Sequence, residues 1–148
     1  MGVESGHGGS VRIEQRVAAP PEKVSAYVSD FRHAREWMVG VEKVEHLGQD
    51  EYSLTIDSPI GKISPGVRIV EQSPESIRWV YTSTIEGGGR VEVSPEAEGC
   101  LVSYAGDFHL KRRFLDRAAR LVGVERFSRT NGERSLARLK YLMEAGRY

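Results

Sequence analysis

Apolar and polar residues alternate with a period of two over much of the first 110 residues. The alternation is clear over 11–17, 52–57, 77–82 and 102–110, as expected for strands with one buried face. Short stretches rich in glycine, proline and serine separate these segments, and we interpret Gly87-Gly88-Gly89 as one such turn. Strands at this spacing, joined by short turns, predict an antiparallel meander.

Helical patterns interrupt the strands near the N-terminus and replace them near the C-terminus. Pro20 and Pro21 end the first strand and suit the first turn of a helix. Apolar residues then recur at helical spacing, and a second short helical turn, which either Ser29 or Asp30 can cap, ends near Trp37. From residue 111 onward, helix-forming residues dominate.

The C-terminal segment predicts a helix with an unusual inner side. One unbroken helix from residue 111 would be about 55 Å long, so we expect a break near Gly123, with Asn131-Gly132 as a second candidate. Bulky residues follow small or polar ones along one side, namely Leu136, Leu139, Leu142 and Met143 after Ser128, Asn131, Gly132 and Ser135. Across a curved sheet, this helix either leaves space beneath its small residues or approaches the sheet without a void.

Strand parity predicts which side chains share the interior. Tyr81 and Tyr104 fall on the inward face, and each has a hydroxyl that needs a partner when buried. They either orient a ligand carbonyl or phenol, or are core tyrosines bonded to backbone or water. The residues we expect to contact a ligand are Trp37, Leu54, Ile56, Val67, Trp79, Tyr81, Tyr104 and Phe108.

Length and composition indicate one domain. We expect a disordered tail over 1–10 and a single domain over 11–148. The one cysteine, Cys100, excludes an internal disulfide and fits a reducing, cytoplasmic compartment. The four histidines lack the pairing typical of metal ligands, so we expect no metal site and no cofactor.

Charge is unevenly distributed, although the formal net charge is zero. Residues 1–110 carry 10 Lys+Arg and 17 Asp+Glu, a net −7, whereas residues 111–148 carry 11 and 4, a net +7. The basic segment either attracts the protein's own acidic body or contacts an anionic surface such as lipid headgroups. The candidate membrane contacts are Lys111, Arg112, Arg113, Arg117 and Arg120. We expect no nucleic-acid partner.

No catalytic signature emerges from the motifs. Ser103, Asp107 and His109 share one side of the last strand, but parity turns them outward, whereas a hydrolase triad converges in a cleft. The glycine triplet joins two strands and opens no helix, so a phosphate-binding loop is disfavoured. The residues expected at the surface include Arg68, Arg78, His33 and His46. Catalytic residues therefore remain unassigned.

Three segments together resemble a known family. Residues 19–24 (APPEKV) are similar to the start of its first helix, and residues 37–45 (WMVGVEKVE) to its next segment, with Val39 where many relatives have proline. Residues 135–140 (SLARLK) are similar to its closing helix. In this order they resemble the helix-grip fold of the START and polyketide-cyclase superfamily, also called SRPBCC.

The resemblance implies an α+β helix-grip domain. A seven-stranded antiparallel sheet would wrap around a long C-terminal helix, with two short helices between strands 1 and 2 and an apolar cavity inside. Members bind lipids, sterols, quinones, plant hormones or polyketides. Some are coenzyme Q-binding proteins, and others resemble a small subunit of carbon monoxide dehydrogenase.

Three functions are compatible with this resemblance. We expect binding or transport of a small hydrophobic ligand, such as a lipid, quinone or polyketide-like molecule, without a reaction. The alternative is a polyketide cyclase, aromatase or dehydrase that acts on a ligand in the same cavity. A third possibility is an adaptor that binds a protein or membrane through the basic segment.

Overall fold

The computed structural model describes residues 8–58, 61–110 and 124–146. Its strands are β1 (Gly8–Val17), β2 (Val41–His46), β3 (Glu51–Ser58), β4 (Gly61–Ile63), β5 (Gly66–Ser73), β6 (Ser76–Tyr81), β7 (Ile85–Glu96) and β8 (Gly99–Leu110). Its helices are α1 (Pro21–Val28), the 3-10 helix η2 (Phe31–His33), α2 (Ala34–Trp37) and α3 (Val124–Glu144).

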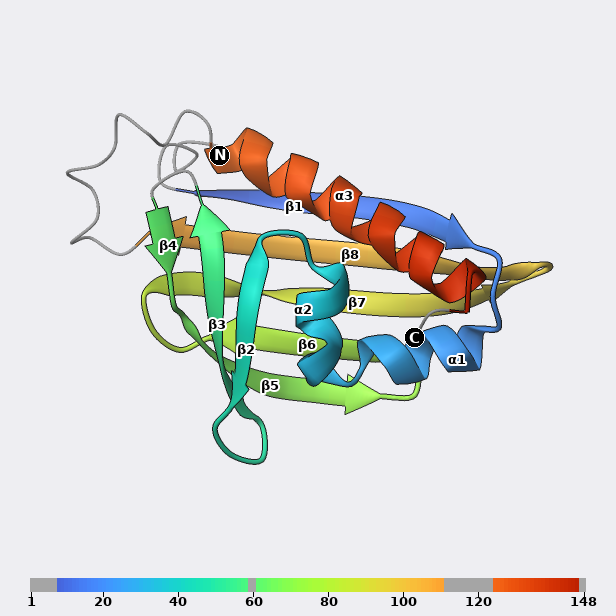
Figure 1. Ribbon diagram of the computed structural model, residues 1–148, viewed down its shortest axis with the longest axis horizontal. Coiled ribbons are helices and arrows are strands. Elements are labelled where there is room, and N and C mark those ends of the chain that lie inside the picture. Colours follow the sequence, from blue (N-terminus) through green and yellow to red (C-terminus); the bar gives the residue numbers. More distant parts are fainter. Residues whose placement is uncertain (1–7, 59–60, 111–123, 147–148) are drawn as a thin grey trace.

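The strands form one antiparallel sheet that curls around α3 (Figure 1). Among the described residues, seven strands follow the order β1-β8-β7-β6-β5-β3-β2, and the short β4 pairs with β3 beside this path. Helices α1, η2 and α2 connect β1 to β2, and α3 contacts β1, β8 and α2. The predicted α+β helix-grip fold is confirmed, with β4 as an addition.

Strand register places the predicted inward residues on the face that α3 covers. Val67 pairs with Tyr81 between β5 and β6, and Val91 pairs with Tyr104 between β7 and β8. Directly opposed residues of an antiparallel ladder share a face. On this face, a side chain at Gly132 of α3 would lie 3.5 Å from the Tyr104 ring.

The glycine triplet of β7 is a strand segment, and its prediction as a turn was wrong. The turn from β6 to β7 instead lies over 82–84, where Thr84 adopts a φ of 74°. A Cβ on Gly88 would lie 2.1 Å from the Trp79 carbonyl oxygen, and one on Gly89 would lie 2.3 Å from Cζ2 of the indole. The glycines therefore allow β6 and its tryptophan to approach β7 closely.

Helix α3 runs without interruption through Asn131-Gly132, so the second candidate break was wrong. The first candidate, Gly123, lies outside the described residues. A Cβ on Gly132 would lie 2.6 Å from Cδ1 of Ile13 on β1. Glycine is tolerated inside this helix because tertiary packing against β1 outweighs its weak helix propensity.

The short helices begin where the sequence indicates. Pro21 is the first residue of α1, a position at which its missing N–H costs nothing. The Asp30 side chain accepts a hydrogen bond from the Arg32 N–H at 3.1 Å and so caps η2. Of the two predicted caps, Asp30 is the one used.

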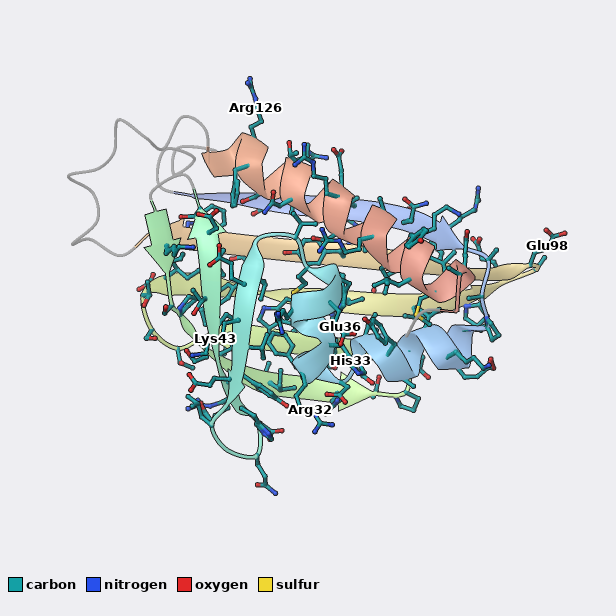
Figure 2. The ribbon with its side chains drawn as sticks, viewed as in Figure 1. Arg32, His33, Glu36, Lys43, Glu98 and Arg126 are labelled. Atoms are coloured by element: carbon teal, nitrogen blue, oxygen red, sulfur yellow. The ribbon has the colours of Figure 1, made fainter. Side chains whose placement is uncertain are left out.

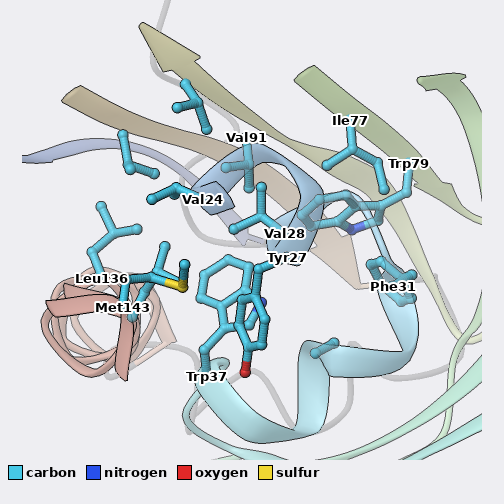
Figure 3. Close-up of a cluster of buried hydrophobic side chains, with 14 of the residues drawn as sticks. Val24, Tyr27, Val28, Phe31, Trp37, Ile77, Trp79, Val91, Leu136 and Met143 are labelled. Atoms are coloured by element: carbon cyan, nitrogen blue, oxygen red, sulfur yellow. The ribbon is translucent and has the colours of Figure 1, made fainter. Parts of the chain in front are cut away.

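The core lies between the sheet and the helices (Figure 3). Val24 of α1, Val91 of β7 and Leu136 of α3 converge there, and all are at most 1% exposed. Trp37 at the end of α2 and Trp79 on β6 are each 2% exposed. This core fixes the positions of the elements that surround the candidate site.

Charged side chains cover the outside, as the labelled Glu98 and Arg126 show in Figure 2. Arg68 pairs with Glu51 at 2.7 Å on the outer face, as expected from parity. His33, in contrast, was wrongly expected at the surface. It is half-buried, and its ring stacks on Tyr27 at a centroid distance of 4.3 Å. Among the described residues, no helix is long and apolar enough to span a membrane.

Candidate ligand cavity

A cavity of about 150 Å³ lies between α3 and the concave face of the sheet. Seven of the eight predicted ligand contacts line it, namely Trp37, Leu54, Ile56, Trp79, Tyr81, Tyr104 and Phe108. Val67 is the exception, because it is fully buried in the core and does not line the cavity. Parity predicts that Val67 points inward but not how far along the strand the cavity extends.

Further apolar residues complete the wall. They are Val11, Met38, Val39, Val41, Ile63, Ile85 and Phe127. Ile85 was missed because the sequence places a turn beside it, and Val39 and Val41 because they belong to the link from α2 to β2. The alternating apolar pattern of β2, with Val41 and Val44 in phase, was the signal that could have identified Val41.

The small and polar side of α3 faces the cavity. Ser128, Asn131, Gly132 and Ser135 all line it. The sequence left a void and a close approach as alternatives, and both occur. Gly132 lies close against β1, and its polar neighbours along the helix border open space.

Two of these polar residues hold α3 to the end of α2. Asn131 Nδ2 donates to the Val39 carbonyl at 2.9 Å, and the Val39 N–H donates to Ser135 Oγ at 2.8 Å. Ser135 Oγ in turn donates to the Asn131 carbonyl at 2.6 Å. Gly40, at a φ of 96°, leaves room for the Asn131 amide, since a Cβ there would lie 2.6 Å from Nδ2. These polar groups therefore already have partners within the protein.

The two cavity tyrosines have different surroundings. Trp79 donates a hydrogen bond to Tyr81, because an indole N–H can only donate. Burial raises the pKa of Tyr81 above its ordinary value, although the bond from Trp79 acts in the opposite direction. Burial, with Tyr81 and Asp107 nearby, also raises the pKa of Tyr104. Both phenols are therefore neutral at physiological pH.

The cavity brings together little catalytic machinery. Ser103 lies outside it and donates to Glu14 at 3.0 Å, as its outward prediction requires. Asp107 lines the cavity but has a half-exposed carboxylate, 3.9 Å from His109 Nε2. Within the described ranges, no group of His, Cys, Asp and Glu side chains could hold a metal ion. The predicted membrane contacts, residues 111–120, lie outside these ranges.

Comparison with solved structures supports the fold. The Zhui aromatase/cyclase from Streptomyces sp. R1128 is 20% identical with a TM-score of 0.74, over 93% of this chain and 94% of that one. TTHA0849 from Thermus thermophilus is 20% identical with a TM-score of 0.77, over 95% and 100%. The chain also matches the di-domain ARO/CYC StfQ from the steffimycin biosynthetic pathway at 14% identity and a TM-score of 0.70, over 96% of this chain but only 52% of that one.

These identities are too low to show more than a shared fold. No curated protein matches the chain significantly. The family model described as "Polyketide cyclase / dehydrase and lipid transport" matches residues 9–144, nearly the whole described chain. The protein therefore belongs to the polyketide cyclase/dehydrase and lipid transport family, within the superfamily that its sequence resembles.

Proposed function

We propose that the protein binds and carries a small apolar ligand in this cavity without changing it chemically. The observation that carries the proposal is the apolar wall, which Trp37, Leu54 and Ile56 represent. Burial of apolar ligand surface contributes about 25 cal/mol per Å². A site of this kind therefore gains affinity mainly from shape and burial.

Cavity size limits the ligand. Pockets for drug-sized molecules usually have volumes of about 300–1,000 Å³. The present cavity has about 150 Å³, a size at which an apolar protein cavity holds about one aromatic ring. We therefore propose a ligand, or the buried part of a ligand, of roughly this size.

A cyclase or aromatase is the second candidate. It is favoured by the fold shared with two proteins described as aromatase/cyclases. Such a reaction needs groups that transfer protons. Asn131 and Ser135 are already bonded to Val39, so Tyr81, Tyr104 and the half-exposed Asp107 are the main remaining groups. This small set supports carriage over catalysis.

A ligand titration tests the proposal. The only two tryptophans, Trp37 and Trp79, both line the cavity, so their indole N–H signals in a ¹H–¹⁵N spectrum should report occupancy. We expect saturable shifts with ethylbenzene as probe. Ile56→Phe should fill part of the cavity and weaken binding by at least about tenfold. No saturable shift in the wild-type protein would refute the proposed carrier.

Thr55→Phe is the matched control. This substitution adds the same ring on the same strand, but Thr55 lies on the opposite face of β3. It should leave the ethylbenzene affinity unchanged. Native mass spectrometry of the purified protein, with extraction of any bound molecule, should in addition identify a natural ligand that remains bound.

A further inference from the structure

The hydroxyl group of Tyr104 has no hydrogen-bond partner within the described part of the chain. A tyrosine hydroxyl that is removed from bulk water normally has a partner. The described chain contains no fully buried polar side-chain atom without one. The Tyr104 hydroxyl must therefore retain some accessible surface, and the residue lines the cavity.

Packing holds the Tyr104 ring and leaves its hydroxyl uncovered by a side chain. The ring lies beneath Gly132 of α3, where a Cβ would be 3.5 Å away. The hydroxyl extends over Gly106 of the same strand, where a Cβ would be 2.6 Å from the oxygen. Both glycines also line the cavity, so the ring is fixed and the hydroxyl lies at the cavity wall.

Tyr81 adds a second donor beside it. Its oxygen accepts from Trp79, so its own proton remains free to be donated. The two hydroxyls are close enough for Tyr81 to raise the pKa of Tyr104. Burial keeps both groups protonated, and the wall around them is apolar.

We propose that Tyr104, assisted by Tyr81, binds the carbonyl oxygen of a small aromatic ketone or similar carbonyl compound whose ring occupies the apolar cavity. The inference rests on the proposed function and specifies its ligand class. A carbonyl oxygen accepts hydrogen bonds but brings no proton, which complements two donors. A carboxylate is disfavoured because Asp107 also lines the cavity, and like charges in such surroundings repel.

A pair of probes with one chemical difference tests this. Acetophenone and ethylbenzene have nearly the same shape, but only acetophenone has a carbonyl. Tyr104→Phe removes the hydroxyl and keeps the ring. It should weaken acetophenone binding by about tenfold, because a buried carbonyl loses its donor, and leave ethylbenzene binding unchanged.

Two further variants sharpen the test. Gly106→Ala keeps the Tyr104 hydroxyl but places a methyl group against it, and should weaken acetophenone more than ethylbenzene. Tyr52→Phe is the matched control, because Tyr52 is a buried tyrosine outside this cavity. It should change neither affinity.

The possible failures can be distinguished. If Tyr104→Phe weakens both probes equally or neither, the carbonyl proposal is wrong, although a cavity that binds ethylbenzene still supports the carrier. If neither probe binds the wild-type protein, both the carbonyl site and the proposed function are wrong.

Discussion

Two glycines of β7 determine how closely Trp79 packs at the cavity. A Cβ on Gly88 would lie 2.1 Å from the Trp79 backbone oxygen, and one on Gly89 would lie 2.3 Å from the indole. Trp79 is 2% exposed and contacts Phe31 edge-on at a centroid distance of 5.3 Å. The indole therefore has little room to move away.

Gly89→Ala should consequently destabilise the protein. The added methyl forces the buried indole to shift, and overpacking of this kind typically lowers the free energy of unfolding by about 1–3 kcal/mol. Urea unfolding followed by tryptophan fluorescence measures this. Gly48→Ala is the control, because its Cβ would meet nothing closer than 3.9 Å. A Gly89→Ala change within about 0.5 kcal/mol of zero would contradict the packing argument.

Residue placement was predictable where it follows from strand geometry. The alternation of the sequence predicts the inward positions of Tyr81 and Tyr104, because successive side chains of a strand point to opposite faces. The glycine triplet was misinterpreted because glycine marks both turns and close approaches. Only the position of Trp79 on the neighbouring strand distinguishes the two.

At the scale of elements, α3 is attached to the rest of the fold at two places. Its middle bonds to Val39 through Asn131 and Ser135. At its end, the Glu144 carboxylate accepts from the Ala18 N–H at 2.7 Å and from Lys140 at 2.6 Å. The bond from Ala18, followed by that from Lys140, holds the pKa of Glu144 below its ordinary value.

This second attachment should make stability depend on pH. Because the pKa of Glu144 is lower in the folded than in the unfolded protein, its contribution is present above the ordinary pKa of 4.5 and is lost as pH falls through the folded value. Glu144→Gln should lower Tm by about 2 °C at pH 7 and have no effect near pH 2, where the wild-type carboxyl is also neutral.

Calorimetry at both pH values checks this, with Glu133→Gln as the control. Glu133 is an exposed residue of the same helix and has no ion pair among the described residues. Its substitution should have no pH-dependent effect on Tm. An equal loss of Tm at both pH values for Glu144→Gln would show that the carboxylate charge does not contribute.

The attachments of α3 were only partly predictable. The stripe of small and polar residues predicts which side of the helix faces the sheet. It does not identify Val39 as the partner, which lies 92 residues from Asn131 and 96 from Ser135. Such pairs depend on the whole fold, and no local periodicity encodes them.

At the scale of the whole molecule, charge separates along the chain. Residues 1–110 have a net charge of −7 and residues 111–148 one of +7. In the described part of the basic segment, Arg126, Arg134 and Arg138 are exposed on α3. Attraction to the acidic body and contact with an anionic membrane remain alternative explanations for this asymmetry.

Vesicle sedimentation distinguishes them. If Lys111, Arg112 and Arg113 contact a membrane, each contributes about 1 kcal/mol, and binding to anionic but not neutral vesicles should weaken as salt is added. Replacing these three residues with glutamine should reduce binding more than Arg134→Gln and Arg138→Gln together. No binding to anionic vesicles at low salt would contradict the membrane prediction.

The pairing of β1 with β8 also determines the order in which the molecule can form. These strands pair over their full length, from Gly8 with His109 to Val17 with Cys100. During synthesis, the first strand leaves the ribosome long before its partner does, and its edge stays unpaired meanwhile. Because such distant contacts form slowly, the nascent chain passes through a period in which this edge is open to aggregation.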